Sequence, residues 1–195
     1  MNHRRTILLV IVALMAPPVL LAKQNQKSEY VGEESRKIKS LSTDDISDLR
    51  NGRGWGLAKA AELNGIPGPA HLLELKDDIP LTDEQASRIR AVFEDMKSKA
   101  ILQGEQLIEL ESRLDSAFGS GTITPDGLQV LLSRIADTHG DLRYIHLSAH
   151  LRMLPILSND QIEKYNSLRG YSKDACAAVP FGHDPKMWRE HNDCN

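Results

Sequence analysis

The sequence predicts an all-α protein built on a long antiparallel helical hairpin with short flanking helices. Two long segments, 82–118 and 124–153, repeat apolar residues at steps of three and four, the spacing of one helix face. Each segment begins with a threonine suited to cap a helix, and Gly119-Ser120-Gly121 separates them. The chain carries essentially no alternation of apolar and polar residues typical of strands. A single hairpin is a thin layer, so we expect two copies to pair as a homodimer that buries the remaining apolar face.

Residues 1–22 have the layout of a signal peptide. Arg4 and Arg5 precede an apolar run from Ile7 to Ala22, and cleavage is expected after Ala22. The alternative is an uncleaved anchor, although this run is interrupted by prolines and is shorter than the roughly 20 residues that span a bilayer. The sequence therefore predicts an exported, extracytoplasmic protein.

The next segments are expected to be less regular. Residues 23–54 are polar and without periodicity, which predicts a flexible leader. A domain over residues 55–171 should open with short helices at 55–63 and 70–76, separated by Asn64-Gly65 and by Pro67-Gly68-Pro69.

Local signals mark the beginnings of the three later helices. Thr82 with Gln85 three positions on forms a capping box before the first long helix. Thr124 followed by Pro125 begins the second long helix, which Pro155 ends. Ser158 with Gln161 repeats the capping box before a last short helix, which ends at Gly170.

Composition argues against several functional classes. A net charge of -3 without a strong basic cluster argues against a nucleic-acid partner. The chain has no phosphate-binding loop, dinucleotide fingerprint, nucleophile elbow or zinc-protease motif. Its hydroxyls and carboxylates form no marked catalytic constellation, so we expect no enzyme and no catalytic residues.

The tail, residues 172–195, contains the chain's two cysteines, Cys176 and Cys194. In an exported protein such a pair most simply forms a disulfide. The alternative adds His183 and His191 to give a metal set of two cysteines and two histidines, although the spacing fits no standard zinc finger.

Three histidines share one face of the second long helix. At 100° per residue, His139, His146 and His150 fall within about 40° of one another. The spacing of His146 and His150 lets both side chains ligate one ion such as zinc, nickel, cobalt or copper. The full candidate set is His146, His150, His139, Met153, His71 and Glu74. Two alternatives are neutral, partly buried histidines with structural hydrogen bonds, and pH sensing at a dimer seam.

The two capping boxes belong to one repeated motif. Leu81-Thr82-Asp83-Glu84-Gln85 and Leu157-Ser158-Asn159-Asp160-Gln161 both read Leu-Thr/Ser-x-x-Gln, one before the first long helix and one after the second. On these residues, the region 55–171 resembles the LTxxQ-motif family of periplasmic stress proteins. That family includes the Spy/CpxP-type chaperones and related CnrX/ZraP-type heavy-metal resistance sensors. The second motif departs from the pattern by having Ser158 in place of threonine.

The resemblance implies a cradle-like dimer without catalytic chemistry. Spy/CpxP-type chaperones hold unfolded clients on a concave face, and CpxP-type relatives also dock to the periplasmic domain of an inner-membrane sensor kinase. Here client contacts would draw on exposed apolar residues and on four basic residues, Arg88, Arg90, Lys97 and Lys99. The alternative for these four charges is simple solvation of an outer helix face. The metal sensors of the family imply a second function, heavy-metal binding.

Overall fold

The computed structural model describes residues 27–171, 184–191 and 194. The all-α fold class is confirmed, because the described residues form helices and no strand, with only an isolated bridge between Ile38 and Leu41. The helices are η1 (Glu33–Ser35), α1 (Thr43–Arg50), α2 (Lys59–Glu62), α3 (Pro69–Glu74), α4 (Asp83–Gly119), α5 (Pro125–Leu151), α6 (Asn159–Leu168) and α7 (Pro185–His191).

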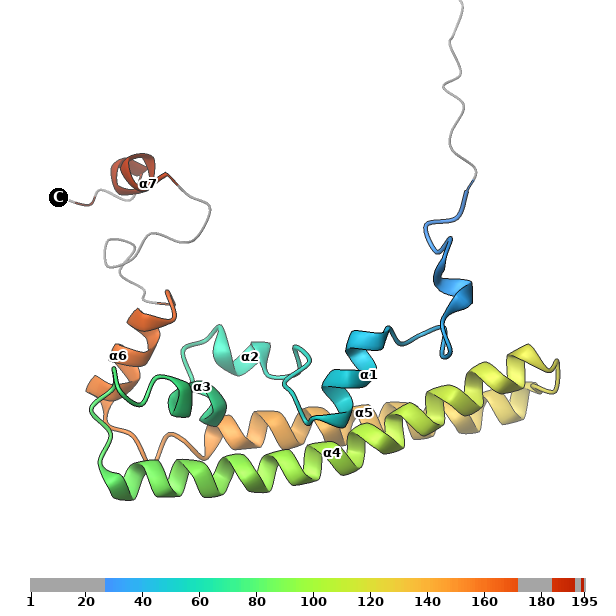
Figure 1. Ribbon diagram of the computed structural model, residues 1–195, viewed down its shortest axis with the longest axis horizontal. Helices are drawn as coiled ribbons and strands as arrows, with labels where there is room; N and C mark the ends of the chain where they lie inside the picture. Colours follow the sequence, from blue (N-terminus) through green and yellow to red (C-terminus); the bar gives the residue numbers. More distant parts are fainter. Residues whose placement is uncertain (1–26, 172–183, 192–193, 195) are drawn as a thin grey trace, which may run out of the picture.

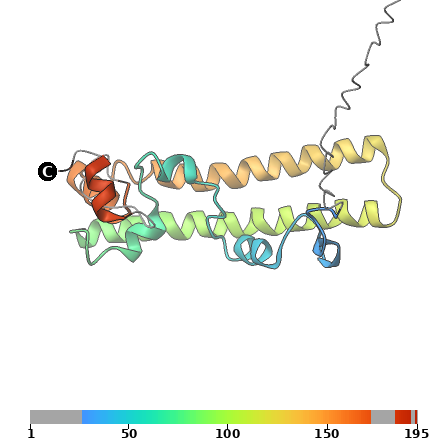
Figure 2. The same ribbon diagram turned by 90° about the horizontal axis from the view of Figure 1, so that it is seen from above.

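Helices α4 and α5 form the frame of the molecule. Both views show them side by side and running in opposite directions, joined by a short turn (Figures 1 and 2). Thr82 caps α4 and Thr124 caps α5 through their side-chain oxygens, as the sequence predicts. Figure 1 also shows the pair bending toward the side that carries α1, α2 and α3. Long helices commonly curve in this way around the core that they cover.

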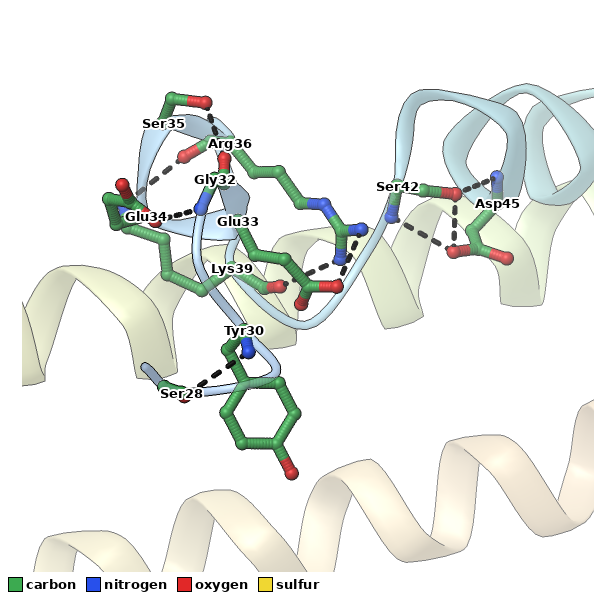
Figure 3. A network of polar contacts seen from close by, with 10 residues as sticks. All are labelled: Ser28, Tyr30, Gly32, Glu33, Glu34, Ser35, Arg36, Lys39, Ser42 and Asp45. Carbon is green, nitrogen blue, oxygen red and sulfur yellow. Dashed lines mark hydrogen bonds and ion pairs between the residues drawn. The ribbon is translucent and has the colours of Figure 1, made fainter. Parts of the chain in front are cut away.

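The expectation of a flexible leader at 23–54 is wrong for its second half. Ser42 and Asp45 form a capping box that begins α1, and Leu49 of that helix is buried. Residues 38–74, here named the covering segment, lie with α6 on one side of the α4–α5 pair (Figure 1). Figure 3 shows the polar contacts that order residues 28–45, including Arg36 with Glu33 at 3.0 Å. The leader therefore belongs to the folded domain from at least Ile38 onward.

Two glycines let the covering segment approach α4 closely. A Cβ on Gly104, in the middle of α4, would clash with the backbone carbonyl of Leu49. Gly52 has a φ of 62° and would place a Cβ 2.9 Å from the carbonyl oxygen of Lys97. The contact with Leu49 explains why α4 contains Gly104, although glycine weakens a helix by about 1 kcal/mol relative to alanine.

The core has two parts along the helical pair. One joins α3, α6 and the adjoining ends of α4 and α5, and contains Leu72, Ile89, Met153 and Tyr165 among its most buried residues. The other lies beneath α1, where Leu49 packs on Ala100, Leu107 and Leu142. The covering segment and α6 thus supply the apolar partners of one side of the pair.

Two helix boundaries differ from the sequence prediction. The helix expected at 55–63 is limited to α2, because Trp55 and Gly56 have φ values of 42° and 71°, which a right-handed helix excludes. Helix α5 ends at Leu151 rather than just before Pro155, because Pro155 has no N–H to donate to the carbonyl of Leu151, four residues earlier, and its ring would clash with that carbonyl in a continued helix. Met153 therefore lies in the turn after α5.

No helix in the described part of the chain is long and apolar enough to cross a membrane. Residues 1–22 lie outside that part, so the signal peptide and the anchor both remain predictions.

Candidate functional site

The two Leu-Thr/Ser-x-x-Gln motifs meet in space through their glutamines. Gln85 Nε2 donates to Gln161 Oε1 at 2.9 Å, and Gln161 Nε2 donates back to Gln85 Oε1 at 3.0 Å. Each amide also donates to a carbonyl near the other motif, Ile156 at 2.7 Å and Pro80 at 2.8 Å. Each glutamine oxygen further accepts the N–H of its own capping residue. The sequence shows the repeat, but not that its two copies bind each other.

This reciprocal contact fixes the beginning of α4 against the beginning of α6. Gln161 is 8% exposed, and the amides in this contact are partly buried. Hydrogen bonds between buried groups are costly to leave unmade, so the pair holds the two helix ends in one register. The motif is therefore a structural clasp at one end of the molecule.

A pocket of about 620 Å³ lies between the covering segment and the helical pair, and we call it the inner pocket. Its wall includes four of the six candidate metal ligands, His71, Glu74, His146 and His150. His150 is 7% exposed, and its Nδ1 donates to the carbonyl oxygen of Ile66 at 2.8 Å. The covering segment thus binds directly to one of the predicted histidines.

His146 is the most deeply buried histidine that the structure describes. It is 3% exposed, and its Nε2 atom has no hydrogen-bond partner among the described residues. Burial, with a smaller contribution from the neighbouring charge of His150, lowers the pKa of His146 to about 4. The side chain is therefore a neutral imidazole at neutral pH.

The other two candidate ligands that line the pocket, His71 and Glu74, already form hydrogen bonds with other side chains. His71 Nδ1 donates to Glu74 at 2.9 Å, and Arg169 donates to His71 Nε2 at 3.4 Å. Arg169 also donates to Glu62 at 3.2 Å, and Glu62 accepts the hydroxyl of Tyr165 at 2.7 Å. Burial and this hydrogen bond raise the pKa of Tyr165. These contacts tie the covering segment to α6 across the pocket.

The remaining two candidates do not join the pocket wall. His139 is exposed and meets the ring of Trp55 edge-on, with centroids 5.8 Å apart. Met153 lies in the turn after α5 and is fully buried in the apolar core. Within the described residues, no three His, Cys, Asp or Glu side chains are grouped closely enough to hold a metal ion. The six-residue set therefore does not form one coordination shell.

A second concavity of about 270 Å³ opens on the opposite side of the helical pair, and we call it the outer groove. Six residues line it: Lys99, Leu102 and Gln103 from α4, and Asp141, Tyr144 and Ile145 from α5. Leu102 is 72% exposed and Tyr144 is 71% exposed. Gln103 Oε1 is buried without a hydrogen-bond partner among the described residues. In Figure 1 no described helix covers this side of the pair.

The four basic residues expected to contact clients do not form one surface. At 100° per residue, Arg88 and Lys99 share one side of α4, whereas Arg90 and Lys97 share the other. Lys99 lines the outer groove and pairs with Asp95 at 2.7 Å. Lys97 lines the inner pocket, where its ammonium lies 5.7 Å from the centroid of the Phe93 ring. Only Arg88 and Lys99 lie on the side of α4 that the covering segment leaves open.

Trp55 and Gln103 have structural features that the sequence analysis did not predict. Trp55 is the one non-glycine residue with positive φ in the described chain, and its Nε1 donates to Asp45 at 2.7 Å. Hydrogen bonds from Ser42 and Trp55 lower the pKa of Asp45. The run Asn51-Gly52-Arg53-Gly54-Trp55-Gly56 carried a signal for a special backbone, since only glycine adopts positive φ without strain. In the sequence, the only sign of Gln103 is that a polar residue interrupts the apolar face of the first long helix.

Comparisons with protein families, curated proteins and solved structures found no match for this chain. The resemblance to the LTxxQ-motif family therefore rests on the two motifs alone. Cys176 and His183 lie outside the described residues, as does the side chain of His191. The Cys176–Cys194 disulfide and the metal alternative in the tail accordingly stay predictions.

Proposed function

We propose that this chain is an exported, non-catalytic envelope-stress protein that binds unfolded or partner proteins, like the Spy/CpxP-type chaperones. The observation that carries the proposal is the outer groove, where two large apolar side chains are exposed beside charged groups. Exposed apolar surface rimmed by polar residues is typical of protein interaction sites. A periplasmic domain of an inner-membrane sensor is one such partner.

The composition of the groove suits an extended and variable client. Leu102 and Tyr144 offer apolar contact from two different helices. Lys99 and Asp141 place opposite charges at the same groove, and Gln103 adds an uncharged polar side chain to its wall. Such a mixture contacts many sequences weakly rather than one sequence tightly.

We place the clients on the side of the outer groove, whereas the resemblance implies the concave face. A client on the concave side would have to displace residues 38–74, which pack there through Leu49 and Leu72. The uncovered side needs no such rearrangement. We therefore assign client binding to the outer groove together with Arg88 and Lys99.

Suppression of client aggregation tests this function. The purified protein, with a chelator present, should reduce light scattering by citrate synthase diluted from guanidinium. Leu102→Ser/Tyr144→Ser should lose most of this effect, whereas Leu63→Ser, a change at another exposed leucine, should keep it. An unchanged effect in the double variant would reject the outer groove, and no effect in the unaltered protein would reject the function.

The homodimer remains part of the proposal. A second copy and a client could both use the uncovered side, so sedimentation should be measured on every variant. A dimeric mass supports the prediction, and a monomeric mass at micromolar concentration contradicts it. A double variant that stays dimeric while losing client binding would separate the two roles.

A second candidate function is binding of a transition metal, favoured by the unpartnered Nε2 of His146 beside His150. Imidazole nitrogen suits zinc, nickel, cobalt and copper. Calorimetric titration with each ion should show binding that disappears in His146→Ala/His150→Ala and persists in His139→Ala. Binding that is absent, or equal in both variants, would exclude this pair as ligands.

A further inference from the structure

The wall of the inner pocket carries more positive than negative charge. Lys59 and Lys97 both line it, and neither forms an ion pair within the described residues. Of the two acids in the same wall, Glu62 pairs with Arg169, whereas Glu74 binds only His71 and keeps its negative charge. Two ammonium groups therefore line the pocket against one carboxylate that no lysine or arginine of the described residues pairs with.

The same pocket offers apolar surface beside this charge. Trp55, Phe93 and Met96 contribute to its wall. Its volume of about 620 Å³ lies within the range of about 300–1,000 Å³ typical of small-molecule sites. Trp55 holds a strained positive φ at this wall, and such strain tends to occur where a ligand is bound. The wall is thus suited to a molecule with an apolar body.

A buried polar atom also lacks a partner at this pocket. His146 lies in the wall, and its Nε2 has no hydrogen-bond partner among the described residues. A nitrogen buried in this wall can pair only with a group or a water that enters the wall beside it. Buried polar groups are nearly always paired in native proteins, so the unpaired nitrogen points to a missing ligand or water.

We propose that the inner pocket binds a small organic anion with an apolar body, such as a medium-chain carboxylate. The ammonium groups of Lys59 and Lys97 attract the charged end, while Trp55, Phe93 and Met96 contact the hydrocarbon. The site lies across the helical pair from the outer groove, so it is separate from the client surface. Its ligand would stabilise the packing of the covering segment on α4 and α5, because binding to the folded state alone raises stability.

Fluorescence of Trp55 tests the proposal with sodium decanoate as the probe. The chain has two tryptophans, so Trp188→Phe leaves Trp55 as the only reporter in the full-length protein. Decanoate should change its emission in a saturable manner. The cation decyltrimethylammonium, with the same hydrocarbon chain, should bind at least tenfold more weakly.

Two variants in this background decide whether the charges matter. Lys59→Gln/Lys97→Gln should weaken decanoate binding at least tenfold, with circular dichroism confirming that the variant is folded. Lys99→Gln, which removes a lysine from the outer groove, should bind as the parent does. Equal binding of the cation, unchanged binding by the double variant, or no saturable signal in the parent would each overturn the proposal.

Discussion

His146 should make the stability of this protein depend on pH between about 4 and 6.5. Its pKa is about 4 in the folded protein, against about 6.5 in an unfolded chain. In this interval the unfolded state binds more protons, so the free energy of unfolding falls as the pH falls. The full contribution is about 3 kcal/mol, present above pH 6.5 and lost by pH 4. Between pH 7.5 and pH 5, about 2 kcal/mol should be lost.

Urea denaturation followed by circular dichroism measures this loss. The comparison uses the unaltered protein, His146→Leu, and His139→Leu as a control at an exposed histidine of the same helix. A chelator keeps metal ions from competing with protons. His146→Leu should lose about 2 kcal/mol less than the unaltered protein between the two pH values, and the control should not differ from it. Equal losses in all three proteins would refute the assigned burial of His146.

Two further changes test the packing of the covering segment and the clasp. Gly104→Ala should lower the free energy of unfolding by about 1–3 kcal/mol, because its Cβ meets the carbonyl of Leu49. Gly140→Ala, in open space on α5, should instead raise the free energy of unfolding by up to about 1 kcal/mol. If both substitutions change this free energy in the same direction, the close contact at Gly104 is contradicted. A double-mutant cycle of Gln85→Ala and Gln161→Ala should give a coupling of about 1–2 kcal/mol. Additive effects would show that the two amides do not stabilise each other.

The helix starts could be predicted because capping is local. Thr82, Thr124 and Ser158 each bind a backbone N–H three residues away, so neighbouring residues alone carry the information. Helix α1 has the same signal in Ser42 and Asp45. The sequence analysis does not predict α1, because this helix also depends on packing against α4. Gly104, which is distant in sequence, makes the close approach of Leu49 to α4 possible.

The candidate site was only partly predictable, for a similar reason. Helical spacing places His146 and His150 on one face, and both line the inner pocket. The hydrogen-bond partners of the histidines, in contrast, come from distant parts of the chain. His150 binds the carbonyl of Ile66, and His71 accepts from Arg169, and only the tertiary fold brings these residues together. The division of the basic residues between two sides of α4, in contrast, was already present in their spacing.

Photo-crosslinking tests the central claim, that the outer groove holds client proteins, most directly. A photoreactive amino acid placed at Tyr144 or at Leu102 should crosslink to unfolded citrate synthase with a chelator present. The same group at Ala60, an exposed position in α2 on the covered side of the pair, should give little crosslinking. Crosslinks from Ala60 alone, or none from Tyr144 and Leu102 while aggregation is still suppressed, would contradict the account.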